Sequence, residues 1–378
     1  MSRATLGQMV VRVALQCNEA DSYLILDENN PAARLLSRPG EGIYNDAGGV
    51  PEANRPFQVV WLSEEHRDAC LARVRARADR SDRTYAGPIV FEGNALAELS
   101  ENAPLQQILA SNPSVRPSLL KAFLGAPNSI KGPTAAEFQR LSGNHLLLIS
   151  QNEESTLSLM FSSILSLAAQ TPSEQVEFVV ADGSPPETVE RAHLDRFVAS
   201  FPGTLQVVRH SDLETAFLRL QQEMKDRSEG QQSGASLPSL FLVVFGLQRF
   251  KKLRNEDELG FSLNPEPSSS PFSILQNILQ EGPGLGIHVW MACDAFSNVQ
   301  RFLGRKLLGE FDMRVAFQMS ANDSAAFLDT PKAAALGLNR ALFSNEQQGL
   351  LESFRPYSLP DAAWLEGAFS LLAQRTPS

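Results

Sequence analysis

From residue 145 onward, short apolar runs alternate with segments in which apolar side chains recur at helical spacing. Strands are predicted at 145–149, 177–181, 205–209, 241–245, 287–293 and 314–319. Helices are predicted between them, at 157–168, 186–200, 213–225, 272–280 and 299–308. The run 241–245 is apolar throughout, which is typical of a strand buried on both faces. The alternation predicts an α/β fold with a mostly parallel sheet flanked by helices.

The opening residues carry a shorter pattern of the same kind. Strands are predicted at 8–16, 43–44 and 57–62, and a helix at 20–36 that begins at the Asp21-Ser22 cap. An arginine-rich helix is predicted at 63–82. Its arginines surround a narrow apolar stripe, so it is either a solvated linker or a contact for DNA.

Glycine and proline punctuate the stretch from residue 87 to 132, where a strand at 88–92 and a helical region at 104–123 are predicted. Two polar insertions, 228–236 and 256–270, are rich in glycine, serine and proline. Their composition predicts loops without regular structure.

The chain repeats part of itself. Residues 12–27 and 314–329 align without a gap at an offset of 314 − 12 = 302, and half of the sixteen positions are identical. The echo continues through Pro31 and Pro331, and then through residues 55–57 and 355–357. Because the second copy follows a full series of strands and helices and the first does not, the chain is expected to open with the tail of one module and to contain a second, whole one.

Composition narrows the choice of function. A net charge of −10 argues against a chain that coats nucleic acid by itself, because phosphate neutralisation needs clustered Lys and Arg. The cysteines, Cys17, Cys70 and Cys293, are three in number and widely spaced, so neither disulfides nor a zinc site is predicted and a reducing cytoplasm fits best. No apolar run is long enough for a membrane span, and no histidine spacing suggests a metal site.

Several segments match a known family in order and spacing. They are Phe123-Leu124-Gly125, the strand 145–149, the apolar strand at Phe241, residues 285–289 and residues 314–317. With these segments the chain resembles the FtsK/SpoIIIE family of P-loop motor ATPases, which pump DNA through hexameric rings. It is also similar to the relatives EccC and EssC, which drive type VII secretion with tandem ATPase modules.

The resemblance implies a RecA-like P-loop NTPase fold, preceded by the tail of a second such module. On this basis we expect residues 1–62 to be the C-terminal strand, helix and hairpin of an upstream ATPase module. Residues 63–118 are expected to be a helical linker, and residues 119–378 a complete module.

The loop that should bind phosphate lacks the residues that such a loop needs. A working site has a glycine-rich loop after the first strand, a Lys for the β- and γ-phosphates and a Ser or Thr for Mg²⁺. This chain has Ser150-Gln151-Asn152-Glu153-Glu154-Ser155-Thr156, with no glycine and no lysine. Glu153 and Glu154 would lie at the positive end of the following helix and repel a nucleotide. A simpler interpretation is that Asn152 caps a helix whose first turn is acidic.

Two further positions of the family's site are also changed. The apolar strand at 240–244 should end in an acid that holds Mg²⁺, but it continues with Phe245 and Gly246. After the next strand, where the family has a polar pair near the γ-phosphate, the chain has Cys293 and Asp294. Asp294 could hold a cation or simply cap a turn. We therefore expect a module that keeps the fold and lacks ATP hydrolysis, with ATP and Mg²⁺ bound elsewhere in the full motor.

Three arginines, Arg301, Arg305 and Arg314, are candidates to act on a neighbouring subunit's nucleotide across a ring interface. The alternative is that Arg301 and Arg305, four residues apart on one helix, pair with surface acids such as Glu310.

Two functions are compatible with the resemblance. In the first, the chain is part of an ATP-driven DNA translocase, and the degenerate module is a structural or regulatory layer of a homo-oligomeric ring next to an upstream motor module. In the second, it is a docking module of a secretion-type motor, which recognises a signal peptide and is indifferent to DNA. The acidic balance favours docking.

Overall fold

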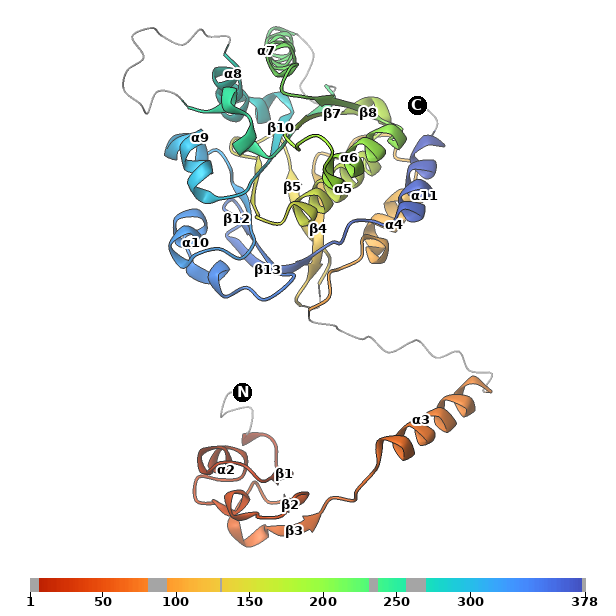
Figure 1. The fold of residues 1–378 in the computed structure, drawn as a ribbon, viewed down its shortest axis with the longest axis vertical. Helices are drawn as coiled ribbons and strands as arrows, with labels where there is room; N and C mark the ends of the chain where they lie inside the picture. The colour runs from red at the N-terminus through yellow and green to blue at the C-terminus, as the bar shows by residue number, and fades with distance from the viewer. Residues whose placement is uncertain (1–6, 81–93, 130, 231–236, 256–269, 376–378) are drawn as a thin grey trace. The chain divides into compact units, whose positions relative to one another are not determined.

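A computed structural model describes residues 7–80, 94–129, 131–230, 237–255 and 270–375. The chain divides into two compact units, Met1–Val90 and Phe91–Ser378, each of which is described by itself (Figure 1). The strand predicted at 88–92 and most of the two polar insertions lie outside the described residues.

The second unit is built on a ten-stranded sheet with the order β5-β4-β13-β12-β11-β6-β10-β9-β7-β8. Strands β11, β6, β10, β9, β7 and β8 run parallel to their neighbours in this series, and β12, β13, β4 and β5 extend the sheet in antiparallel fashion. The bounds are β4 Leu120–Pro127, β5 Thr134–Phe138, β6 Leu146–Ile149, β7 Val176–Asp182, β8 Thr204–Val208, β9 Ser239–Phe245, β10 Ile287–Cys293, β11 Met313–Ala316, β12 Ala341–Asn345 and β13 Leu350–Pro356. The predicted flanked, mostly parallel sheet is confirmed.

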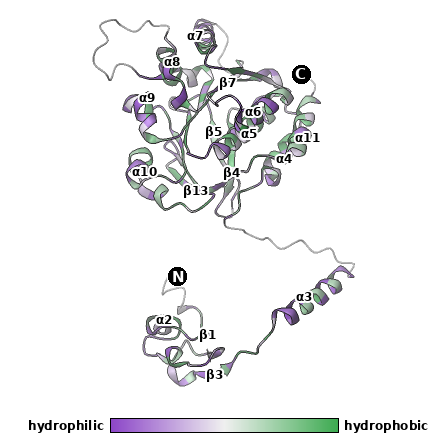
Figure 2. Cartoon of the chain, in the orientation of Figure 1, coloured by the Kyte–Doolittle hydropathy of each residue, from purple (hydrophilic) through white to green (hydrophobic). Residues whose placement is uncertain are grey.

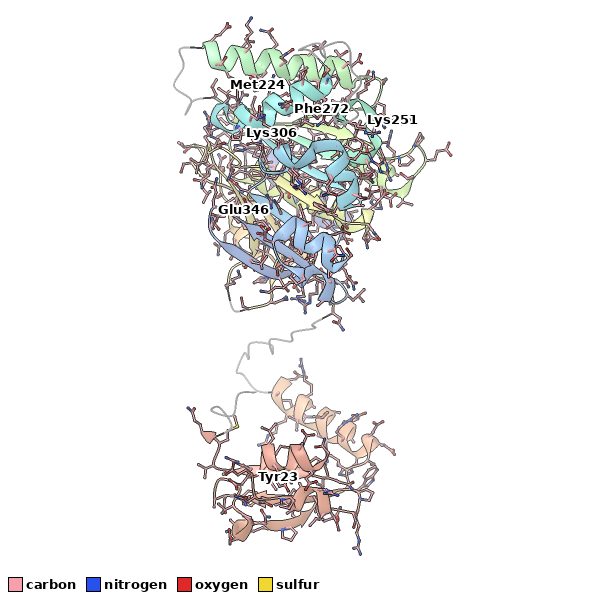
Figure 3. All side chains as sticks on the ribbon, turned by 90° about the vertical axis from the view of Figure 1, so that its left-hand side faces the viewer. Tyr23, Met224, Lys251, Phe272, Lys306 and Glu346 are labelled. Atoms are coloured by element: carbon pink, nitrogen blue, oxygen red, sulfur yellow. The ribbon has the colours of Figure 1, made fainter. Side chains whose placement is uncertain are left out.

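Helices cover both faces of this sheet (Figure 1). One face carries α4 Ala103–Leu109, α5 Glu153–Ala169, α6 Val189–Ser200 and α11 Ala362–Ala373. The other carries α7 Leu213–Glu229, α8 Pro271–Glu281, α9 Phe296–Leu308 and α10 Ala321–Leu328. Met224 of α7 and Phe272 of α8 belong to the core of this second face (both are labelled in Figure 3). Alternate residues of β9 enter the two cores because successive side chains of a strand point to opposite faces.

The structure differs from the prediction between residues 94 and 127. Only Ala103–Leu109 is an α-helix there, and Leu120–Pro127 is a strand that pairs with β5 and β13. Leu105 and Leu109 are buried in the same core as α5. Residues 94–118 thus pack as part of the second unit, because their apolar side chains complete its helical layer, whereas the sequence pattern suggested a linker.

The first unit contains a three-stranded antiparallel sheet of β1 Arg12–Leu15, β2 Glu41–Asn45 and β3 Arg55–Gln58. The helix α2 is Glu19–Ile25, capped by Asn18, and is followed by the short 3-10 helix η1, Ala32–Leu35. The helix predicted at 20–36 is therefore interrupted by a turn at residues 28–29, where the Asn30 N–H donates to the Asp27 carbonyl at 2.8 Å. The small core consists of Ala14, Leu26, Ala33 and Ile43.

The helix α3, Glu64–Asp79, begins at the Ser63 cap and has no buried residue (Figure 2). Hydrophilic and hydrophobic residues are interspersed along it. Arg67 pairs with Asp68 and Arg75 pairs with Asp79, each at 2.9 Å. The arginines are thus partly balanced by acids on the same helix.

Candidate functional site: a filled nucleotide position

The three changed positions of the predicted site meet at one edge of the sheet. The strands β6, β10 and β9 are neighbours and parallel, so Ser150, Asp294 and Gly246 follow their carboxyl ends side by side. The cavity there has a volume of about 40 Å³. A water needs about 10–15 Å³ measured in this way, whereas pockets for drug-sized ligands span roughly 300–1,000 Å³. The volume of this cavity lies well below that range.

The polar groups at the start of α5 are occupied by local hydrogen bonds. Asn152 is the N-cap, and its Oδ1 accepts from the Ser155 backbone N–H at 2.9 Å. The Thr156 hydroxyl donates to the Asn152 carbonyl at 2.9 Å. Ser150 Oγ accepts from the Asn152 N–H at 3.1 Å. Ser155 and Thr156 are both buried.

The two acids of this turn are used differently. Glu154 is exposed. Glu153 forms a two-point ion pair with Arg249, in which Nη1 lies 3.4 Å from one carboxylate oxygen and Nη2 contacts the other. The resulting pair lines the cavity together with Gly246 and Gln248.

The sequence analysis missed Arg249. It belongs to the 3-10 helix η5, Leu247–Arg249, which starts after Gly246 with a φ of 81°. This left-handed conformation suits glycine and turns the chain back over the end of β9. A glycine after a buried strand, followed closely by a basic residue, is the sequence signal that could have identified the pair.

The third changed position, after β10, carries Cys293 and Asp294. Burial raises the pKa of Cys293 to about 12, so its thiol is protonated. Asp294 accepts a hydrogen bond from Asn298 Nδ2 at 2.8 Å, one turn into α9. Among the described residues, no group of three or more His, Cys, Asp or Glu could hold a metal ion. The Asp294 carboxylate is thus in contact with α9 of its own unit.

The three candidate arginines have different environments. Arg301 and Arg305 are exposed on α9, and Gly304 between them has non-helical angles (φ 63°, ψ 179°), so their spacing does not place them on one continuous helical face. Arg314 is buried. Its guanidinium donates to the carbonyls of Phe311 (3.0 Å) and Phe327 (3.1 Å) and pairs with Glu346 at 3.1 Å (labelled in Figure 3). Arg314 is thus an internal anchor, a role that the sequence analysis did not anticipate.

No protein-family model matches this sequence, and no curated protein matches it. Solved structures do match. The cytoplasmic domain of the type VII secretion ATPase EccC from Thermomonospora curvata aligns with 100% of this chain and 46% of its own length, at 17% identity and a TM-score of 0.56. This chain therefore spans about half the length of that domain.

Two further structures have the same fold. EssC (ATPases 2 and 3) from Geobacillus thermodenitrificans matches over 78% of this chain and 54% of its own, at 14% identity and a TM-score of 0.51. The pCW3 conjugation coupling protein TcpA, in its monomer form with ATPγS, matches over 90% of this chain and 92% of its own, at 11% identity and a TM-score of 0.51. The predicted fold, a mostly parallel sheet flanked by helices, is confirmed by its likeness to these ATPase domains. In the described part of the chain, no helix has the length and apolar character needed to cross a bilayer.

Proposed function

We propose that the second unit is a degenerate ATPase module of an FtsK/SpoIIIE-type motor, which binds no Mg-ATP at the ends of β6, β9 and β10. The observation that carries this proposal is the ion pair between Glu153 and Arg249 in a cavity of about 40 Å³. ATP hydrolysis would take place in another module of the assembly, and this unit would act as a structural or regulatory layer of a cytoplasmic ring.

The physical reason is a competition between charges. A helix N-terminus attracts an anion through its free N–H groups and its dipole. Here the first turn of α5 already carries Glu153 and Glu154, and Arg249, a cation that could attract phosphate, is paired with Glu153. A nucleotide would have to break this pair and approach two carboxylates, with neither lysine nor glycine to compensate.

Calorimetric titration of the chain with Mg-ATP tests the proposal. We expect no saturable heat and no shift in melting temperature with the wild type. Glu153→Gln, which removes one carboxylate and releases Arg249, should gain weak nucleotide binding if the pair is what blocks the site. Glu154→Gln is the matched control, since Glu154 lies on the same turn without contacting Arg249. Micromolar binding by the wild type at this site would overturn the proposal.

The proposal includes an upstream motor module next to the first unit. In the second unit, β11 lies between β12 and β6, the strand that leads into the phosphate position. In the first unit, the corresponding β1 pairs with β2 alone within the described residues. A strand of an ATPase module, in parallel alignment like β6, would complete the first unit in the same way.

A second candidate function is partner docking. A groove of about 300 Å³ lies between α6, α11 and the chain at 359–360. Its floor carries Phe161 and Phe197, whose rings stack with centroids 4.1 Å apart, and Phe369. An amphipathic peptide helix could place apolar side chains there. This groove favours a signal peptide over DNA, in line with the net charge of −10.

The two candidates differ in what stimulates the assembled motor. A DNA translocase predicts that duplex DNA accelerates ATP turnover by the complete assembly. A docking module predicts that DNA has no effect and that a cognate helical peptide binds the groove. Leu365→Glu should abolish peptide binding, whereas Leu371→Glu, on the exposed side of α11, should not. DNA-stimulated turnover without peptide binding would exclude docking.

A further inference from the structure

A second cavity of this unit lies at the opposite end of the parallel strands from residues 150–156, 245–246 and 293–294. Its volume is about 530 Å³, and it is lined by residues near the amino ends of β9 and β10, by the end of β5 and by the segment before β4. The lining residues are Arg116, Pro117, Ser118, Leu120, Phe138, Gln139, Arg140, Leu141, Ser239, Gly284 and His288. None of them is acidic.

Two arginines project into this cavity and are held in place by backbone carbonyls. Arg116 Nη1 donates to the carbonyl of Leu237 at 2.7 Å and to Ser239 Oγ at 2.9 Å. Arg140 Nη2 donates to the same carbonyl at 2.8 Å. The Arg140 guanidinium lies against Gly286, where a Cβ would come within 2.8 Å of it. The backbone is therefore shaped to accommodate a guanidinium at this point.

The guanidinium of Arg140 lies near two other cations, Arg116 and Arg227. Its Nη1 atom is buried and has no hydrogen-bond partner among the described residues. Burial, together with the nearby Arg116 and Arg227, lowers the pKa of Arg140 to about 10. Arg227 has its own acid, Glu223, at 2.7 Å. A buried donor without a partner and a cation beside other cations both cost stability, and a bound anion would offset both.

The rest of the cavity lining is largely apolar and could contact a less polar part of a ligand. Leu120, Phe138 and Leu141 form an apolar wall. His288 is buried, and burial lowers its pKa to about 4, so at neutral pH it is an uncharged ring packed edge-on against Phe138 at 5.4 Å. The volume lies in the range of pockets for drug-sized ligands, which combine an apolar lining with a few convergent polar groups.

We propose that this cavity, which we call the arginine pocket, binds a small phosphorylated compound. Its phosphoryl group would be held by Arg140 and Arg116, and its less polar part would rest against Leu120, Phe138 and Leu141. Guanidinium groups match phosphate oxygens in two-point geometry, and a dianion neutralises the local excess of positive charge better than a single carboxylate does. The filled nucleotide position takes no part in this site.

Inorganic pyrophosphate is the first probe, because it presents phosphoryl groups without a base. We expect it to raise the melting temperature of the full chain in a saturable way and to broaden in ³¹P NMR spectra. Arg140→Gln should weaken binding at least tenfold, and Arg140→Lys should retain part of the affinity. Arg196→Gln, an exposed arginine of α6 outside the pocket, is the matched control and should bind as the wild type does.

Folding of the variants is checked by melting without ligand. We expect Arg140→Gln to melt no lower than the wild type, because it removes one of several mutually repelling cations. If Arg140→Gln is less stable, Leu141→Glu, which places an acid at a half-exposed position of the pocket rim, should also abolish binding and provides an independent test. Absence of a pyrophosphate effect in the wild type, or an equal effect in Arg140→Gln, would overturn the proposal.

A comparison of sites separates this proposal from the proposed loss of ATP binding. The triphosphate of ATP could itself enter the arginine pocket. Mg-ATP binding that disappears in Arg140→Gln and persists in Glu153→Gln would support the pocket and leave the degenerate module intact. Binding that persists in Arg140→Gln would contradict the degenerate module and would not involve the pocket.

Discussion

The two copies of the internal repeat share their hydrogen bonds and differ in their surroundings. Ser22 Oγ donates to the Asn30 carbonyl at 2.9 Å and accepts from the Ala33 N–H at 3.2 Å. Ser324 Oγ does the same with Thr330 at 2.6 Å and Ala333 at 3.1 Å. The repeat is thus a structural one, a strand and a helix pinned by one serine.

The equivalent strands β1 and β11 differ in burial because their neighbouring strands differ. Val315 of β11 pairs with Leu148 of β6 and Phe343 of β12 and is fully buried. Its counterpart Val13 of β1 has a neighbouring strand on one side and is 54% exposed. Local hydrogen bonds therefore suffice to form the strand and helix of the repeat. Burial of its strand requires a second neighbouring strand and the helices that cover it.

The hairpins of the two copies also differ in pairing. Asn45 ends β2 and Asn345 ends β12. Asn45 faces Arg12, but Asn345 faces Met313, and Arg314 faces Ser344 instead, so the register differs by one residue. The pairing near residues 55–57 and 355–357 differs as well. Pro56 faces Ile43 of β2, whereas β13 pairs with β12 only through residues 350–354, and Pro356 faces Gly125 of β4 on the other side. The longer loop before β3, which contains the 3-10 helix η2 Pro51–Ala53, accounts for the changed register of this strand.

The largest contrast should come from one charge placed in each copy. Val315→Asp buries a carboxylate between β6 and β12, so we expect the second unit to lose about 4 kcal/mol or more of unfolding free energy. Val13→Asp should change the stability of the first unit by less than about 0.5 kcal/mol, because the site is exposed. Urea unfolding followed by the buried Trp290 reports the second unit, and hydrogen exchange in β2 reports the first. Equal losses would contradict the difference in burial.

Arg12 and Arg314, at equivalent positions of the two copies, should give the next largest difference in stability. Arg314→Met leaves carbonyls of Phe311 and Phe327 without a donor inside the second unit, and we expect a loss of about 2–3 kcal/mol. Arg12 also donates to the carbonyls of Ile25 and Leu26, but its side chain is half-exposed and water can replace the lost donor, so we expect Arg12→Met to cost about 1 kcal/mol or less. Arg314→Lys keeps the charge near Glu346 and is the control for the ion pair. Full stability in Arg314→Lys would show that the forked geometry of the guanidinium is not required.

Acid should weaken the second unit through two buried histidines, whereas the histidine in the described part of the first unit, His66, is exposed. Burial lowers the pKa of His145 to about 3 and that of His288 to about 4, so both rings are neutral when folded. An unfolded histidine binds a proton near pH 6.5. As the pH falls from about 6.5 towards 4, the unfolded state therefore binds more protons and stability decreases, by up to about 1.4 kcal/mol per pH unit for each ring.

Urea midpoints of the second unit at pH 7.0 and 5.5 measure this effect. These values are chosen as roughly bracketing the unfolded histidine pKa. His288→Gln should reduce the pH dependence by about one proton. His66→Gln, on the fully exposed α3, should leave it unchanged. An unaltered slope in His288→Gln would show that this ring is not held neutral.

The smallest expected effect tests what the copies share. Ser22→Ala and Ser324→Ala each remove a donor and an acceptor from the same two local bonds. We expect similar costs of about 1 kcal/mol in the respective units, since the bonds are local and both serines are buried. Hydrogen exchange of Ala33 and Ala333 measures both. A loss of stability in one copy alone would mean that the contribution of the serine hydrogen bonds also depends on the neighbouring strand.

The repeat, the alternation of strands and helices from residue 145 to 319, and the altered residues at 150–156, 245–246 and 293–294 followed from the sequence alone. Apolar runs reveal buried parallel strands, and the carboxyl ends of such strands lie together by geometry. The site could therefore be located at one edge of the sheet before its contacts were known.

The tertiary structure alone decided how that site is filled and where the other charges lie. Arg249 and Glu153 are far apart in sequence, as are Arg116, Arg140 and His288, and local patterns do not encode which long side chains meet. The same holds for Arg314, which looked able to reach a neighbour but is bonded inside its own unit, and for Val13 and Val315. Hydrophobic periodicity depends on neighbours along the chain, whereas burial and ion pairing depend on partners brought together only by folding.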